Sequence, residues 1–263
     1  MKAIILAAGY ATRMYPLTKD RPKSLLPIGT RAVLDFTLDR LATVEELDTV
    51  YLVTNSRFFS QFVRWWEEAK SSRPWPWRRF EIVDDGTWDN ESRLGAIGDL
   101  AFVLDLHGIH DDLIVTAADN IFPFDFSHPV EYFRRIGQDV IVAYELEDPE
   151  RLRRTGVVQV DSQGRVIDFQ EKPSQPASRL AVPPLYVLKA DTLELIPAYL
   201  EEGNSRDAPG NLIAWLHRRV PMFVWQFHGE VLDIGHLESY VRACQILEGQ
   251  AKSSQHPLPG LIT

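Results

Sequence analysis

The chain has 263 residues, 45% of them hydrophobic, and a formal net charge of −9 at pH 7. This length allows one large α/β domain or two small ones, and such a chain can bury its core without a disulfide or a structural metal. The acidity argues against nucleic-acid binding, and no apolar run reaches the roughly 18–20 residues of a membrane span, so we expect a soluble cytoplasmic protein.

The first half of the chain alternates segments of strand and helix character. The predicted strands are short apolar runs rich in branched residues, at residues 2–7, 49–54, 80–83, 113–118 and 140–144. The predicted helices carry apolar side chains at helical spacing, at residues 33–41, 58–69, 94–106 and 128–136. This alternation predicts right-handed strand–helix–strand units, and therefore an α/β fold with a doubly wound, mostly parallel, Rossmann-like sheet.

The pattern changes after about residue 150. Residues 156–160 and 165–169 flank a Gly-containing turn, which predicts a β-hairpin. The remaining predicted elements are strands at 181–188 and 222–227 and helices at 192–200, 211–219 and 237–248. No internal repeat is present, so we expect one domain over residues 1–249, followed by a loose tail at 250–263 that is rich in Ser, Pro and Gly.

A basic loop follows the first predicted strand. Residues 1–31 carry a net charge of +5, so the rest of the chain carries −14. Backbone N–H groups near Ala8 and Gly9 can bind an oxyanion, and Arg13 and Lys23 can pair with phosphate oxygens. With a single glycine, the turn matches neither the G-x-G-x-x-G pattern of nicotinamide-binding proteins nor a Walker A sequence. Residue types alone leave two interpretations: a phosphate-binding loop or a solvated basic loop.

Two carboxylates lie far apart in the sequence, each next to an apolar run. Asp119 directly follows the predicted strand at 113–118, and open parallel sheets bind ligands at the carboxyl ends of their strands. Asp233 interrupts the apolar run that begins at Val231. One or two carboxylates with phosphate oxygens and waters are the usual ligands of Mg²⁺. The alternative for Asp119 is an ordinary turn aspartate.

The pair Glu171-Lys172 stands directly before Pro173. The proline keeps Lys172 out of helical geometry, so its side chain can be presented at the end of the hairpin strand. The alternative is a surface turn with a salt bridge.

Together these segments resemble the signature of the sugar-1-phosphate nucleotidylyltransferases. The segments, in chain order, are residues 6–18 with 22–27, 119–122, 156–160 with 169–173, and 232–235. The resemblance extends along nearly the whole chain, and residues 119–122 are most similar to the glucose-1-phosphate thymidylyltransferase branch. Four motifs in the expected order favour a phosphate-binding loop over a solvated one.

The resemblance implies transfer of a nucleotidyl group from an NTP to a sugar 1-phosphate, giving an NDP-sugar and pyrophosphate, with Mg²⁺ as cofactor. It implies a nucleotide-binding half at about residues 1–125 and a sugar-phosphate-binding half at about 126–249. The implied catalytic residues are Arg13, Lys23 and Lys172. The implied binding residues are Leu6, Ala8, Gly9, Arg13, Lys23 and Gly95 for the nucleotide, Asp119 and Asp233 for the metal, and Asn120, Gly156, Glu171 and Lys172 for the sugar phosphate.

Two departures from the family pattern leave the substrates open. Tyr10-Ala11 replaces a Gly-containing pair, and residues 84–95 do not match the base-reading loop of the thymidylyltransferases. Glucose 1-phosphate with dTTP or UTP is the first expectation. The alternatives are a cytidylyl- or guanylyltransferase acting on another sugar phosphate or on phosphocholine, and a non-catalytic regulatory or assembly homologue. The tryptophans at residues 65–77 fit either core packing or a contact in a homo-oligomer, a dimer or tetramer.

Overall fold

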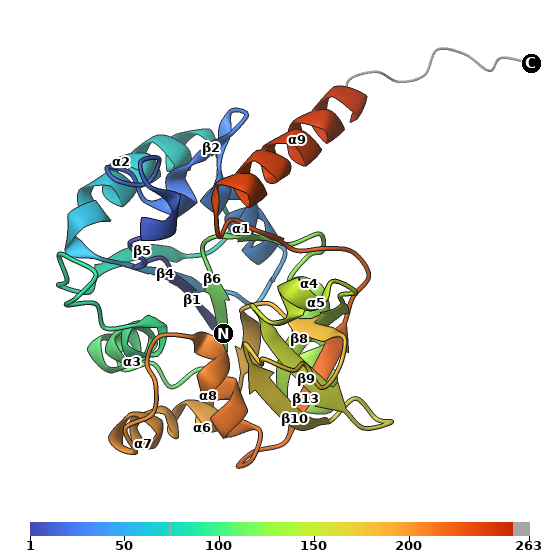
Figure 1. Cartoon of the computed structure of the whole chain (residues 1–263). Helices are drawn as coiled ribbons and strands as arrows, with labels where there is room; N and C mark the ends of the chain where they lie inside the picture. The colour runs from blue at the N-terminus through green and yellow to red at the C-terminus, as the bar shows by residue number, and fades with distance from the viewer. Residues whose placement is uncertain (74, 255–263) are drawn as a thin grey trace, which may run out of the picture.

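The computed structural model describes residues 1–73 and 75–254 and has one large sheet at its centre (Figure 1). Its strands are β1 (Lys2–Leu6), β4 (Thr49–Thr54), β5 (Arg79–Asp84), β6 (Leu113–Ala117), β8 (Asp139–Glu145), β9 (Gly156–Val160), β10 (Val166–Glu171), β11 (Leu180–Val182), β12 (Leu185–Leu188) and β13 (Met222–Gln226). The strand order is β10-β9-β11-β8-β12-β6-β1-β4-β5, and β13 pairs with β8. Parallel pairing joins β1 to β4 and β6, and β4 to β5, so the predicted α/β class with a mostly parallel sheet is confirmed.

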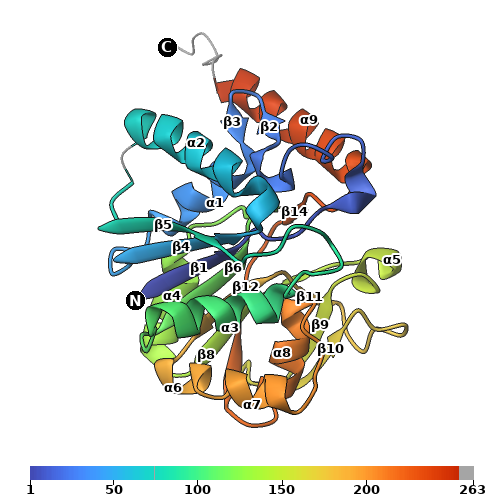
Figure 2. The same ribbon diagram turned by 90° about the vertical axis from the view of Figure 1, so that its left-hand side faces the viewer.

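Helices cover both faces of the sheet (Figure 2). One face packs against α1 (Val33–Leu41), α2 (Ser56–Ser72) and α4 (Ser127–Ile136). The opposite face packs against α3 (Ala96–His107), α6 (Ala190–Leu193), α7 (Ile196–Glu201) and α8 (Pro209–Leu216). The helices α5 (Pro149–Leu152) and α9 (Leu237–Ser254) complete the set in the described residues.

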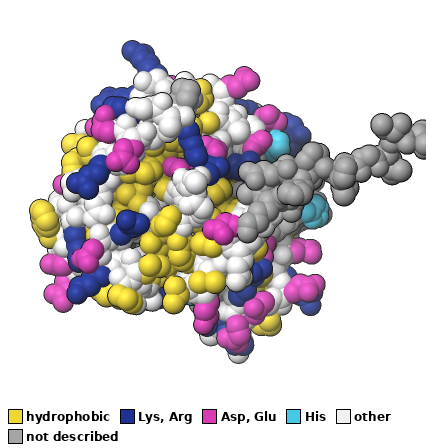
Figure 3. Space-filling view, turned by 90° about the horizontal axis from the view of Figure 1, so that it is seen from above, with side chains coloured by type: hydrophobic (Ala, Val, Ile, Leu, Met, Phe, Trp, Pro, Cys, Tyr) yellow, Lys and Arg dark blue, Asp and Glu magenta, His cyan; other side chains and the backbone are white. Residues whose placement is uncertain are grey.

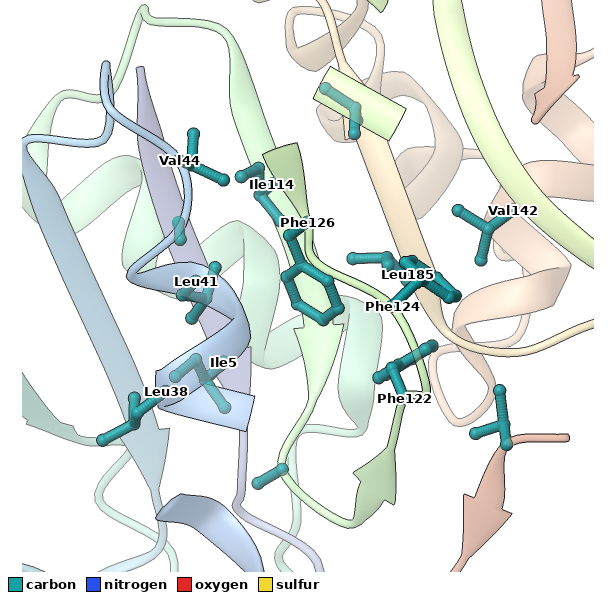
Figure 4. Close-up of a cluster of buried hydrophobic side chains, with 14 of the residues drawn as sticks. Ile5, Leu38, Leu41, Val44, Ile114, Phe122, Phe124, Phe126, Val142 and Leu185 are labelled. Carbon is teal, nitrogen blue, oxygen red and sulfur yellow. The ribbon is translucent and has the colours of Figure 1, made fainter. Parts of the chain in front are cut away.

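Strand β1 lies in the middle of the core. Ile5 points to the side of α1, where it lies near Leu38, Leu41 and Phe126 (Figure 4). Ile4 points to the opposite side, into the cluster that contains α3. Both isoleucines are fully buried, which is the pattern of a central parallel strand. This central position fixes the loop that follows Leu6 at the carboxyl edge of the sheet.

The second half of the chain differs from its prediction in three elements. The strand expected at 181–188 is divided into β11 and β12 by Pro183-Pro184, because proline has no N–H to donate to a neighbouring strand. The helix expected at 192–200 is divided into α6 and α7, and Pro197 lies in the first turn of α7, where its missing N–H costs nothing. Helix α9 extends to Ser254, beyond the predicted start of the tail, and residues 255–263 lie outside the described residues. The predicted hairpin is confirmed as the antiparallel pair β9–β10.

The tryptophan-rich stretch stacks on itself. The ring centroids are 5.4 Å apart for Trp66 and Trp75, 5.7 Å for Trp75 and Trp77, and 3.9 Å for Trp66 and Phe80. These contacts support the core-packing interpretation. The face that carries α2 and α9 exposes hydrophobic side chains between scattered basic and acidic ones (Figure 3). The homo-oligomer stays a prediction.

Among the helices of residues 1–73 and 75–254, none combines the length and apolar character needed to cross a bilayer.

Candidate active site

The basic loop after β1 is held in place by hydrogen bonds at both of its ends. Asn55, which caps the N-terminus of α2, donates from Nδ2 to the carbonyl oxygen of Ala8 at 2.8 Å. The Thr18 hydroxyl donates to the carbonyl oxygen of Ala11 at 2.8 Å. Gly9 is exposed, and a methyl group on its Cα would meet no atom within 4 Å. The loop is therefore ordered and presents open backbone at Gly9, where an anion can approach.

The ends of β1 and β6 meet below this loop. The backbone N–H of Ala118 donates to the carbonyl oxygen of Leu6 at 3.1 Å. Asp119 follows directly, so it lies at the carboxyl edge of the sheet beside the basic loop. This is the ligand-binding edge of an open parallel sheet.

A small second sheet brings the two predicted metal ligands together. Strand β7 (Asn120–Ile121) pairs antiparallel with β14 (Leu232–Asp233), and Asp233 lies opposite Asn120. The backbone N–H of Ile234 donates to the carbonyl oxygen of Asp119 at 2.9 Å. A methyl group on Gly235 would lie 3.0 Å from an oxygen of Asp233, so a glycine there leaves room for that carboxylate.

Lys23 reaches this carboxylate pair. It begins the 3-10 helix η2 (Lys23–Leu25), and its ammonium group forms an ion pair with Asp119. Burial opposes the charge of Lys23, but the nearby Asp119 and Asp233 outweigh that effect and raise its pKa. Burial, reinforced by the charge of Asp119, raises the pKa of Asp233 to about 6.

Arg13 belongs to the same group of residues. It lies exposed on the 3-10 helix η1 (Thr12–Met14), close enough to Lys23 for its charge to act against the raised pKa of that lysine. The structure thus brings together Arg13, Lys23, Asp119 and Asp233. Asn120 joins them by donating from Nδ2 to Asp119 at 2.8 Å.

The donor set at this edge fits a magnesium ion. Within the described residues, no group of three or more His, Cys, Asp and Glu side chains is arranged to hold a metal by itself. Burial is the main cause of the raised pKa of Asp233, and the charge of Asp119 adds to it, so a cation between the two carboxylates would relieve their repulsion. Mg²⁺ prefers one or two carboxylates and takes its other ligands from phosphates and waters.

A second group of predicted residues lies at the end of β10. Lys172 has a positive φ of 48° and its backbone N–H donates to the carbonyl oxygen of Thr155 at 3.1 Å. The side chain of Lys172 is 57% exposed, while that of Glu171 is 13% exposed. The Lys172 ammonium lies 3.7 Å from the Glu171 carboxylate, so the predicted pair stays together as a cation at the surface and an acid below it.

Two glycines make room for the Glu171 carboxylate. A methyl group on Gly156 would lie 2.7 Å from the ring of Phe169 and 3.3 Å from Glu171 Oε2. A methyl group on Gly210, in the first turn of α8, would lie 1.9 Å from the same oxygen. The sequence predicts Gly156 in this site but not Gly210. The only local signal of Gly210 is a Pro-Gly pair at the start of a helix, and proline in the first turn is common in helices that bind nothing.

Gly95 lies apart from both groups, at the N-terminus of α3. Its φ is +80°, and a methyl group there would lie 2.6 Å from the carbonyl oxygen of Arg206. That carbonyl accepts the N–H of Ile97 at 2.9 Å, and Arg93 forms two hydrogen bonds of 3.1 Å with the Asp207 carboxylate. Residues 206–207 therefore hold the segment before α3 closely, and only glycine fits at position 95.

Arg151 lies near the carboxylate pair. It comes from α5, and its guanidinium lies 2.6 Å from the Glu230 carboxylate. Its charge also acts on the buried Asp233, so α5 approaches the carboxylate pair from the side of β9 and β10. The sequence does not single out Arg151, because nothing in the local pattern distinguishes it from the neighbouring Arg153 and Arg154.

The chain matches known proteins along most of its length. The family model described as nucleotidyl transferase matches residues 2–250. A protein of Sulfolobus acidocaldarius assigned as a mannose-1-phosphate guanyltransferase is 33% identical over 243 residues, covering 92% of this chain and 62% of the relative. A UTP–glucose-1-phosphate uridylyltransferase of Synechocystis is 27% identical, covering all of this chain and 69% of the relative. The chain thus spans about two thirds of the length of these relatives.

Solved structures share the fold. A UDP-glucose pyrophosphorylase complexed with UDP-glucose has a TM-score of 0.78 at 22% identity, covering 95% of this chain and 98% of that one. A structure assigned as a glucose-1-phosphate thymidylyltransferase of Bacillus anthracis has a TM-score of 0.75 at 23% identity, covering 94% of each chain. The match of the family model over residues 2–250 shows that this chain belongs to the nucleotidyl transferase family.

Proposed function

We propose that the chain transfers a nucleotidyl group from an NTP to a sugar 1-phosphate and releases pyrophosphate. The observation that carries this proposal is the ion pair of Lys23, from the basic loop, with Asp119, close enough to Asp233 for the charge of Asp233 to act on the lysine. Such a site can hold a triphosphate and a divalent cation at one edge of the sheet. Membership of the nucleotidyl transferase family and the names of the relatives support the same reaction.

The reaction needs charge compensation more than acid–base chemistry. An oxygen of the sugar phosphate attacks the α-phosphorus of the NTP, and the bond to the β-phosphate oxygen breaks. The attacking phosphate is already anionic at pH 7, so no general base or covalent nucleophile is required. Two unit charges 4 Å apart repel by about 4 kcal/mol at an effective dielectric constant near 20. Offsetting this repulsion is the main task of the protein.

The basic side chains would offset this repulsion at different positions in the site. Arg13 and Lys23 follow Gly9 in the basic loop and would hold the leaving pyrophosphate. Lys172, exposed at the end of β10, would neutralise the phosphate of the sugar. Asp119 and Asp233 would hold Mg²⁺, which when bound supplies positive charge to the phosphate oxygens. These positions would align the attacking and leaving groups.

The largely buried Glu171 and the backbone at Gly156 would contact sugar hydroxyls, and Asn120, next to Asp119, would add a further contact. Burial raises the pKa of Glu171, and the charge of Lys172 acts against that shift. A carboxylate that is largely shielded from water accepts strong hydrogen bonds from hydroxyl groups. This arrangement favours a sugar over phosphocholine, which has no such hydroxyls.

Three substrate pairs are favoured. Glucose 1-phosphate with dTTP or UTP is the first expectation. The 33% identity to the relative assigned as a mannose-1-phosphate guanyltransferase favours GTP with mannose 1-phosphate as the second. A non-catalytic homologue is disfavoured, because the basic and acidic residues of the site are all present.

A matrix assay tests the proposal directly. Five NTPs are each combined with several sugar 1-phosphates and Mg²⁺, and pyrophosphate release is measured. We expect release from at least one pair, and from none when the sugar phosphate is left out. A folded protein that releases no pyrophosphate with any pair would contradict the proposed function.

Substitution of the carboxylates tests the metal role. We expect Asp119→Ala and Asp233→Ala each to lower Mg²⁺-dependent turnover by about 100-fold or more, because each removes a ligand that supports charge compensation. Asp105→Ala, an exposed aspartate on α3, is the matched control and should keep full activity. Circular dichroism should show all three variants folded. Near-normal turnover in either site variant would remove that carboxylate from the mechanism.

A further inference from the structure

Tyr10 lies in the basic loop directly after the exposed Gly9. Its side chain is 3% exposed, and its ring centroid lies 6.4 Å from that of Phe58 on α2. The next residue, Ala11, has a positive φ of 48°. The loop therefore turns Tyr10 into the body of the protein and leaves the adjacent Gly9 exposed.

The Tyr10 hydroxyl contacts the segment between β5 and α3. It lies 3.0 Å from the Oγ1 of Thr87, which is itself 5% exposed. Thr87 Oγ1 donates to the Asp85 carboxylate at 2.7 Å, and the backbone N–H of Thr87 donates to the same oxygen at 2.7 Å. A hydroxyl has one proton, and Thr87 gives it to Asp85, so Tyr10 must be the donor to Thr87.

The network ends beside α3. Asp85 lies close enough to Asp99, in the first turn of that helix, for its charge to act on the Asp99 carboxyl, and both residues are buried. The backbone carbonyl of Gly95, just before the same turn, accepts the N–H of Asp99 at 2.8 Å. Hydrogen bonds thus join Tyr10 through Thr87 to Asp85, in the segment that leads to Gly95 and α3.

We propose that Tyr10 and Thr87 form a latch that couples the triphosphate loop to the nucleobase side of the site. This inference rests on the proposed function and on the nucleotide-binding roles that the family resemblance implies for Gly9 and Gly95. With the latch closed, the backbone at Gly9 and the segment before Gly95 hold one relative position before the NTP arrives. Binding of the NTP then costs less free energy, because the two segments are already ordered. Tyr10 is a positioning residue, because it acts through the loop and does not contact the reacting atoms.

Hydrogen exchange of the ligand-free protein tests the latch without any assay of activity. Tyr10→Phe keeps the buried ring and removes only the hydroxyl, and Thr87→Val keeps the shape of the side chain. We expect faster amide exchange at residues 9–15 in each variant, and no increase in the double variant beyond that of Thr87→Val, since Tyr10→Phe removes only a bond that Thr87→Val has already removed. Thr87→Ser, which keeps a hydroxyl, should exchange like the wild type. Tyr15→Phe is the control, because that ring is 44% exposed in the same loop.

Two results would overturn the latch. One is wild-type exchange at residues 9–15 in Tyr10→Phe and Thr87→Val. The other is an additive effect in the double variant, which would mean that the two hydroxyls act separately.

Steady-state kinetics then test the coupling to the ligand. We expect Tyr10→Phe to raise KM for the NTP about fivefold, the loss of one ordinary hydrogen bond, with kcat and KM for the sugar 1-phosphate within about twofold of wild type. An unchanged KM for the NTP in an active enzyme would overturn the coupling. If the wild type itself releases no pyrophosphate, the proposed function fails, while the exchange result still decides the latch.

Discussion

Asp99, buried near Asp85, should give the stability of the protein the strongest pH dependence that we expect from a single residue. Burial, followed by the charge of Asp85, raises the pKa of Asp99 to about 8. An unfolded chain releases this proton above about pH 4. The folded chain therefore binds more protons than the unfolded chain between about pH 4 and 8, and the free energy of unfolding falls as the pH rises through that range.

Asp99→Asn should remove this pH dependence. The amide N–H can replace the carboxyl proton in the contact with Asp85 and cannot be lost at high pH. We expect the variant to exceed the wild type in unfolding free energy by a few kcal/mol at about pH 8, and by clearly less at about pH 5. Urea denaturation at both pH values measures the difference, with the exposed Asp105→Asn on the same helix as control. An equal difference at both pH values would show that the pair does not share a proton.

The packing of α8 against β10 shapes the part of the site that we propose binds the sugar. Glu171 ends β10 and lies between Gly156 of β9 and Gly210 of α8, each of which lacks the methyl group that would displace it. A helix that carried alanine at position 210 could not approach this carboxylate as closely. The contact between two elements, and not the acid alone, positions Glu171.

Gly210→Ala should therefore weaken binding of the sugar 1-phosphate and leave the stability of the protein nearly unchanged. The added methyl group would lie 1.9 Å from the end of the flexible Glu171 side chain, so the carboxylate must move while the backbone can stay. We expect KM for the sugar 1-phosphate to rise about tenfold or more, because small displacements of binding groups are costly. The melting temperature should change little, since alanine favours a helix over glycine by about 1 kcal/mol. Equal increases in KM for both substrates would argue against a sugar-specific role of this contact.

At the scale of the whole molecule, Glu230 connects three distant segments. It precedes β14 and accepts Arg151 from α5 at 2.6 Å and Arg242 from α9 through two bonds of 2.6 and 2.7 Å. The hydrogen bonds from Arg242, followed by the charge of Arg151, lower the pKa of Glu230. The resulting stability is present above the unfolded pKa of about 4.3 and is lost as the pH falls through the lower folded value.

Glu230→Gln should weaken this connection modestly. The arginines are about half exposed, so solvent screens the pair. We expect a loss of about 1 kcal/mol or less in unfolding free energy at pH 7, with little difference from wild type at about pH 3. Thermal unfolding at both pH values measures it, and Glu131→Gln, exposed on α4, is the control. A loss that persists unchanged at the acidic pH would mean that the charge of Glu230 is not its source.

The sequence alone determined the parts of this protein that depend on local pattern. The apolar run of β1, the basic loop with Arg13 and Lys23, and the position of Asp119 at a strand end all follow from short stretches of chain. Strand and helix periodicities are local, so the alternation and the mostly parallel sheet were predictable as well.

Only the tertiary structure decided which of these residues meet. Asp233 reaches Asp119 through the two-residue pairing of β7 with β14, which is too short to carry a pattern of its own. Gly210 matters because α8 packs on β10, and Tyr10 matters because its hydroxyl meets Thr87. These contacts join segments that are far apart in the chain, and their free energy comes from the packing of the whole sheet, so no local spacing could predict them.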